Sequence, residues 1–201
     1  MLWAGRWLCG LRYQFEGLEN IPDTPSVVLI KHSTVFETYA QLVVFPPHAW
    51  VLKRELKWIP MFGWGLAAMR PIAIDRNAGH SAVNQVIEQG RKRLADGIWV
   101  NIFPEGTRVR AGETKKYGVS GAALAKAAGV KIVPVAHNAG DFWARRGMRK
   151  HPGLIRFVIG PPIDPTDRSA RETNIAAQDW IERKMAEISP RSYAGKKAAG
   201  H

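Results

Sequence analysis

Residues 27–40, VVLIKHSTVFETYA, hold the clearest structural pattern in this chain. The run from Val27 to Lys31 is apolar until its last residue, which is typical of a strand that is buried on both faces of a sheet. A helical pattern follows from Thr34 to Val44, so the sequence predicts a strand that leads directly into a helix. Units of this kind build α/β proteins, whose functional side chains gather at the carboxyl ends of the strands.

The same alternation repeats along the chain. The other runs expected as strands cover residues 50–53, 71–75, 98–103, 131–136 and 154–159. The other segments with helical periodicity cover residues 80–95, 119–128 and 169–188, and Gly97 and Gly129 are plausible C-terminal stops. The sequence therefore predicts an α/β fold, in which helices flank a layered, mixed and largely parallel sheet.

Composition points to an anionic partner. The chain has 201 residues, a length that fits one domain, and its 29 Lys plus Arg against 17 Asp plus Glu give a net charge of +12. The eight Trp favour a membrane interface over nucleic acid or a soluble phosphate compound, because Trp and Arg both suit the headgroup region. Cys9 is the single cysteine, which excludes an internal disulfide and favours a reducing compartment.

Residues 1–15 are expected to form an amphipathic interfacial segment ahead of one domain at 16–190 and a flexible basic tail at 191–201. On a helix, apolar side chains would share one side of the segment while two arginines reach out to the headgroups: Leu2, Trp3, Trp7, Leu11, Arg6 and Arg12. A helix that packs on its own domain is the alternative. No window of the sequence approaches the length of a membrane span.

His32 is the first candidate for chemistry, since it directly follows the strand expected at 27–31. Glu37 lies five residues further on, where a carboxylate can hold one ring nitrogen and stabilise the imidazolium that a general base forms. The alternative is structural, because Thr34 and Glu37 also match the capping-box pattern at a helix start.

The stretch NIFPEGTRVR, residues 101–110, is the second candidate. Pro104 ends a predicted strand, and Arg108 and Arg110 follow a short turn. Guanidinium groups bind phosphate with two parallel hydrogen bonds, so the loop suits a phosphate. Glu105 would either accept a hydrogen bond from a substrate hydroxyl or hold the arginines apart. A charged surface turn is the alternative.

A covalent enzyme intermediate has no evident nucleophile in this sequence, because Gly-x-Ser-x-Gly is absent and Cys9 lies in the basic N-terminal segment. The histidines show no HExxH or other tight ligand spacing, so neither a metal nor a cofactor is expected. Direct attack by a substrate hydroxyl is the better hypothesis.

Together, KHSTVFET and FPEGTR resemble the glycerolipid acyltransferase family, in particular the 1-acylglycerol-3-phosphate acyltransferases. The resemblance covers nearly the whole chain and implies a glycerol-3-phosphate acyltransferase-like fold. It places His32 on the histidine that deprotonates the acceptor hydroxyl and Glu37 on the acidic position of the HxxxxD motif. Two departures accompany it: Glu37 stands where Asp is commoner, and Gly118 replaces a frequent lysine.

Two further blocks strengthen the resemblance: residues 53–76, associated with acceptor binding, and VKIVPVA at 130–136, expected beside the acyl-donor path. The resemblance implies a binding site for the acceptor phosphate. Its residues would be Lys53, Arg76, Glu105, Gly106, Thr107 and Arg108.

The activity that the resemblance implies is transfer of a fatty acyl group to the free sn-2 hydroxyl of 1-acylglycerol 3-phosphate, which gives phosphatidic acid. The donor would be acyl-CoA or acyl carrier protein, and the enzyme would sit on the anionic cytoplasmic face of the inner (plasma) membrane, peripherally or shallowly inserted. The alternatives are another lysolipid acceptor, such as lyso-ornithine lipid, and a non-catalytic lipid-binding protein. A nucleic-acid module is compatible with the pI of 10.2, but no such signature is present.

Overall fold

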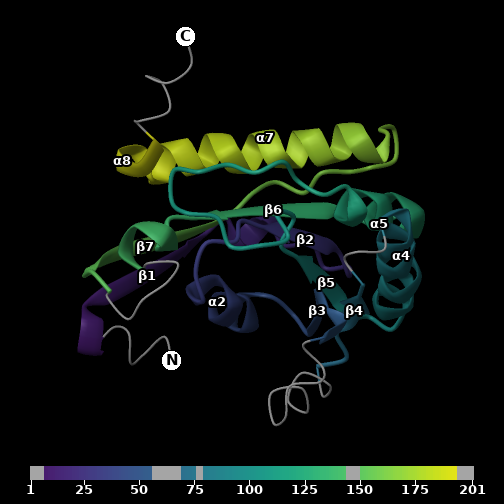
Figure 1. Cartoon of the computed structure of the whole chain (residues 1–201), viewed down its shortest axis with the longest axis horizontal. Helices are drawn as coiled ribbons and strands as arrows, with labels where there is room; N and C mark the ends of the chain where they lie inside the picture. The colour runs from purple at the N-terminus through teal and green to yellow at the C-terminus, as the bar shows by residue number, and fades with distance from the viewer. Residues whose placement is uncertain (1–6, 56–68, 76–78, 144–149, 194–201) are drawn as a thin grey trace.

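A computed structural model describes residues 7–55, 69–75, 79–143 and 150–193 of the chain. These residues form a seven-stranded sheet with helices on both faces (Figure 1). The strands are β1 Leu11–Glu16, β2 Val27–Ile30, β3 His48–Lys53, β4 Ile72–Ile74, β5 Trp99–Ile102, β6 Ile132–His137 and β7 Gly153–Ile159. The helices are η1 Leu18–Asn20, α2 Phe36–Val44, α4 His80–Ala95, α5 Ser120–Ala128, α6 Ala139–Phe142, α7 Ala170–Ile188 and α8 Pro190–Tyr193.

The strand order is β1-β7-β6-β2-β5-β3-β4. Five neighbouring strands, from β6 to β4, run parallel, whereas β7 runs antiparallel to β6 and pairs in parallel with β1. The α/β fold with a mixed, largely parallel sheet is therefore confirmed. Because the five strands run in one direction, the loops that follow β2, β3 and β5 leave the sheet at the same edge.

Strand β2 shows how one strand serves two cores. All four of its side chains are buried, and they alternate between the faces of the sheet. Val27 and Leu29 join the cluster under α4, α5 and α7, whereas Val28 and Ile30 join the cluster that contains Phe36 of α2. In Figure 1, α7 runs along one face of the sheet and α2 lies on the other.

Local signals account for the ends of the long helices. Helix α5 ends at Gly129, which adopts φ +65°, a left-handed conformation that costs glycine little. Helix α7 begins with a capping box, in which Ser169 and Glu172 each satisfy a backbone N–H of the other.

Strand β1 corrects one expectation. Leu11 was expected on an amphipathic helix, but it lies in β1 and is buried, because β1 pairs with β7 along its whole length. The boundary expected after residue 15 therefore falls inside a strand. Residues 7–9 are helical, and Leu2, Trp3 and Arg6 lie outside the described residues. At the other end, α8 occupies the start of the tail expected from residue 191.

Candidate active site

The turn between β2 and α2 brings His32 and Glu37 together. The distance from His32 Nδ1 to Glu37 Oε1 is 2.9 Å. Glu37 stands in the first turn of α2 and is buried, whereas the His32 side chain stays 16% exposed. An ionised carboxylate only accepts hydrogen bonds, so Nδ1 carries the proton and Nε2 carries the lone pair. Glu37 thus prepares His32 to accept a proton at Nε2.

The Glu37 carboxylate also organises the turn itself. Oε1 accepts hydrogen bonds from the backbone N–H groups of Ser33 at 2.8 Å and Thr34 at 2.7 Å. Oε2 accepts one from the Thr34 hydroxyl at 2.6 Å. The two sequence interpretations of Glu37 are therefore compatible, since one carboxylate holds both the start of the helix and the imidazole. The longer side chain at the position where Asp is commoner reaches the ring without difficulty.

Glu37 is ionised across the physiological range. Burial acts to raise its pKa, but His137, the His32 ring and the Thr34 hydroxyl outweigh burial and hold the pKa at about 2. A charge that is this well solvated by protein groups is available to stabilise a positive imidazole at neutral pH.

His137, at the end of β6, is a residue of the site that the sequence analysis missed. It is fully buried, and its Nε2 lies 2.7 Å from the Lys31 carbonyl and 3.7 Å from Glu37 Oε2. The N–H of Ala139 donates to Nδ1 at 3.3 Å, so Nε2 carries the proton that faces the Lys31 carbonyl. Burial lowers the pKa of His137, against the opposing effect of the Glu37 carboxylate. The sequence does offer one signal for His137, because it directly follows the strand predicted at residues 131–136, where functional side chains are expected.

The loop that contains FPEGTR, residues 103–108, lies directly against the His32 turn. The Phe103 ring stacks on the His32 ring, with centroids 3.9 Å apart and an angle of 18° between the planes. The backbone N–H of Val109 donates to the His32 carbonyl at 2.8 Å. The two motifs, which are separated by about seventy residues in the sequence, thus form one site at the carboxyl edge of the sheet, because they follow the neighbouring parallel strands β2 and β5.

Glu105 faces inward. Its Oε2 accepts a hydrogen bond from the His32 backbone N–H at 3.2 Å, and its Oε1 lies 3.2 Å from Lys31 Nζ. Burial raises the pKa of Glu105 to about 7, against the opposing effect of the Lys31 ammonium. These contacts differ from both sequence expectations, a substrate hydroxyl and the neighbouring arginines, because the turn directs the carboxylate into the protein.

Gly106 makes that turn possible. Its φ is +67°, and its N–H donates to the Phe103 carbonyl at 3.0 Å. The chain then emerges with Thr107 exposed and Arg108 half-buried. Within the described parts of the chain, Arg108 forms no ion pair with a carboxylate. Its guanidinium is therefore available to an anionic ligand.

Lys53 and Arg76 are the two remaining residues that were predicted to bind the acceptor phosphate. Lys53 ends β3 and is exposed at the same edge of the sheet. Arg76 lies outside the described residues.

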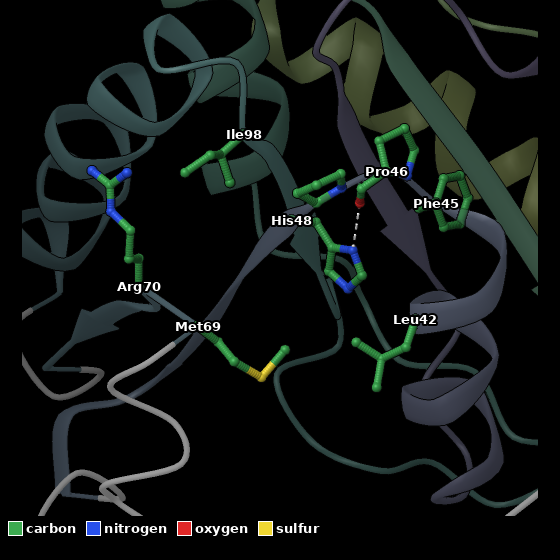
Figure 2. Close-up of a pocket in the computed structure, with 8 residues that line it drawn as sticks. Leu42, Phe45, Pro46, His48, Met69, Arg70 and Ile98 are labelled. Atoms are coloured by element: carbon green, nitrogen blue, oxygen red, sulfur yellow. Dashed lines mark hydrogen bonds between the residues drawn. The ribbon is translucent and has the colours of Figure 1, made fainter.

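A cavity of about 420 Å³ lies elsewhere in the fold (Figure 2). His48 begins β3 and Ile98 directly precedes β5, so the cavity opens at the amino ends of the parallel strands. Figure 2 shows the His48 ring between Leu42 and Met69, with Nδ1 bonded to the Pro46 carbonyl at 2.9 Å. The cavity is thus at the opposite edge of the sheet from His32.

A family model described as Acyltransferase matches residues 12–138, which is more than half of the chain. The chain belongs to the acyltransferase family. The matched span contains His137, the His32 turn and the loop that carries Arg108. Helix α7 lies beyond it.

Curated relatives support this membership. The acyltransferase is 46% identical over 192 residues to a 1-acyl-sn-glycerol-3-phosphate acyltransferase of Pseudomonas aeruginosa, an alignment that covers 94% of this chain and 75% of the relative. It is 33% identical over 167 residues to the protein of the same name from Escherichia coli, with 80% of this chain and 66% of the relative covered.

A solved structure has the same architecture. The crystal structure of the 1-acyl-sn-glycerophosphate (LPA) acyltransferase from Thermotoga maritima matches with a TM-score of 0.73 and 25% identity, over 88% of this chain and 72% of that chain. Among the helices described for this acyltransferase, none has the length and hydropathy of a membrane span.

Proposed function

We propose that this acyltransferase moves a fatty acyl group from acyl-CoA or acyl carrier protein to the free sn-2 hydroxyl of 1-acylglycerol 3-phosphate, which gives phosphatidic acid. One observation carries the proposal: a His32 ring held by Glu37 lies against the loop that carries Arg108, in a chain 46% identical to an enzyme of that name. A proton acceptor beside an available guanidinium suits an alcohol that bears a phosphate.

The His32 ring supplies the acid–base chemistry. Nε2 takes the proton from the acceptor hydroxyl as its oxygen attacks the thioester carbonyl, and Glu37 stabilises the imidazolium that results. The tetrahedral intermediate then collapses, the new ester bond remains, and the thiolate leaves with the proton that His32 returns. General acid–base catalysis of this kind contributes roughly 10²- to 10⁴-fold in rate. The thioester is already activated, so no protein nucleophile is needed.

The loop after β5 supplies orientation. Arg108 binds the acceptor phosphate, with Lys53 or Arg76 as a second cation, and thereby holds the hydroxyl near His32. Gly106 and Thr107 shape the turn that presents Arg108, and the buried Glu105 fixes that turn to the His32 backbone.

An apolar face provides the membrane contact. Trp7 and Leu8 are 72% and 83% exposed, and Leu42 and Val43 of α2 are 49% and 64% exposed. The helical residues 7–9 and α2 lie on the side of the sheet opposite α7 (Figure 1). Exposed apolar side chains on one side of a protein with a charge of +12 suit the anionic cytoplasmic leaflet. The lysolipid acceptor resides in the same leaflet.

Acyl transfer from labelled oleoyl-CoA to a panel of lysolipids tests the function. We expect 1-acylglycerol 3-phosphate to be acylated fastest, and His32→Ala to abolish transfer without loss of folding. His151→Ala is the matched control, because His151 is exposed outside the site. Faster acylation of lyso-ornithine lipid would identify that lipid as the acceptor. Binding to vesicles without transfer to any lysolipid would indicate a non-catalytic lipid-binding protein.

A further inference from the structure

Lys31 is fully buried, which is rare for a lysine. Its ammonium meets three acceptors: Glu182 Oε1 at 3.0 Å, the Glu113 carbonyl at 3.1 Å and Glu105 Oε1 at 3.2 Å. The ammonium donates hydrogen bonds to Glu182 and to the Glu113 carbonyl, and its contact with Glu105 is an ion pair. This arrangement offsets the high cost of burying a charge, which an apolar residue would avoid altogether.

The three acceptors belong to two separate segments. Glu105 lies at the start of the loop at residues 104–118, Glu113 lies in its second half, and Arg108 lies between them. Glu182 projects from α7, on the far side of Lys31. Lys31 therefore connects two points of the Arg108 loop, one on each side of Arg108, to α7.

Lys31 is also linked, through Glu105, to His32, the next residue in the sequence. At the end of β2, successive side chains point to opposite faces, so Lys31 enters the layer of α7 while His32 stacks on Phe103. The Glu105 carboxylate contacts both residues, since one oxygen lies against Lys31 Nζ and the other accepts from the His32 backbone N–H. A shift of the ammonium would move the loop relative to the ring.

We infer that Lys31 is a positioning residue, which together with Glu182 of α7 fixes the Arg108 loop relative to the His32 base. The inference rests on the proposed function, in which Arg108 holds the acceptor phosphate. It adds α7, which lies beyond the span matched by the family model, to the machinery of the site. Orientation of an alcohol next to its base is a large part of such catalysis.

The variant Lys31→Met tests the inference through substrate-specific kinetics. We expect the KM for 1-acylglycerol 3-phosphate to rise about tenfold, since the Arg108 loop loses its fastening, while the KM for acyl-CoA stays within twofold. Hydrogen exchange in peptides covering residues 104–118 should accelerate, a readout that does not depend on activity. Lys184→Met is the control, because Lys184 pairs with Glu187 on the outer surface of α7. Unchanged exchange and an unchanged acceptor KM in Lys31→Met would overturn the inference.

The double variant Lys31→Met/Glu182→Gln separates positioning from stability. Removal of the lysine alone leaves the buried Glu105 and the half-buried Glu182 without their cation, and neutralising Glu182 should raise the melting temperature again. The acceptor KM should nevertheless stay raised. Return of both quantities to wild-type values would mean that Lys31 serves the fold alone, which refutes the inference.

The single variant Glu182→Gln covers the case in which Lys31→Met does not fold, because it keeps the shape of the side chain. We expect a rise of about threefold in the acceptor KM, with Glu187→Gln unchanged. A wild-type KM and wild-type exchange at 104–118 in Glu182→Gln would contradict the role of α7. Absence of transfer by the wild-type chain would instead contradict the proposed function, and the exchange measurements would still report on the Lys31 contacts.

Discussion

The variant Glu37→Gln isolates the charge beside His32. The Gln oxygen can take the place of Oε1, where the N–H groups of Ser33 and Thr34 hold it and where it still accepts from His32 Nδ1. The Thr34 hydroxyl can rotate to accept from the new amide. The variant therefore keeps the geometry and the tautomer of His32, and removes only the negative charge.

The loss of this charge should change both kcat and the pH dependence of stability. A hydrogen bond to a charged group is worth about 1.5–3 kcal/mol, so loss of the charge that stabilises the imidazolium should lower kcat by roughly 10- to 150-fold. The folded-state pKa of Glu37, about 2, lies below its ordinary value of 4.5, so the ionised carboxylate stabilises the fold above pH 4.5. The shift corresponds to about 3 kcal/mol, a contribution that is lost as the pH falls from 4.5 to 2.

Steady-state rates of thiol release at saturating acyl-CoA and 1-acylglycerol 3-phosphate measure the first effect, and urea unfolding from pH 7 to pH 3 measures the second. We expect the stability difference between wild type and Glu37→Gln to shrink as the pH falls. Glu88→Gln is the control, because Glu88 pairs with Lys92 on the exposed side of α4. A folded Glu37→Gln variant with kcat within threefold of wild type would refute the role of the charge.

Three further outcomes follow from the structure. Arg108→Ala should raise the KM for the phosphate-bearing acceptor at least tenfold, whereas Arg110→Ala should change it little; a selective rise in the KM for acyl-CoA would place the phosphate elsewhere. The folded-state pKa of Glu105 is raised to about 7, so this carboxyl destabilises the fold as the pH rises from 4.5 to 7. Over that range, the free energy of unfolding of the wild type should fall by about 3 kcal/mol relative to that of Glu105→Gln. Parallel curves of unfolding free energy against pH for the two proteins would argue against that pKa. Replacing Trp7 and Leu8 with Ser should weaken binding to anionic vesicles severalfold, measured by sedimentation, and undiminished binding would exclude this face as the membrane contact.

The elements with strong local patterns could be predicted from the sequence. Helix α4 begins and ends where its periodicity does, and the buried run at β2 becomes a central strand. His32 and Glu37 could be found because five residues of turn and helix determine their distance. The adjacency of FPEGTR followed from the rule that parallel strands end at one edge.

The remaining features depend on partners far along the chain. Residues 11–16, LRYQFE, do alternate between apolar and polar side chains, but an edge strand in this segment is specified only by pairing with β7, about 140 residues later. In the sequence, Lys31 has the pattern of a polar residue at the end of a strand. Its burial cannot be predicted from that pattern, because it depends on Glu182, which is 151 residues away. The direction of Glu105 likewise depends on that lysine.

In the proposed reaction, the stack of Phe103 on His32 limits the route by which the acceptor alcohol reaches the imidazole. One face of the imidazole is covered by the Phe103 ring, with the two ring centroids 3.9 Å apart, and the hydrogen bond to Glu37 restrains rotation of the imidazole. The lone pair of Nε2 lies in the ring plane, so an incoming hydroxyl has to travel parallel to the Phe103 surface. The site therefore discriminates by the direction of approach as well as by charge, and it disfavours alcohols whose substituents crowd the carbinol carbon on the Phe103 side.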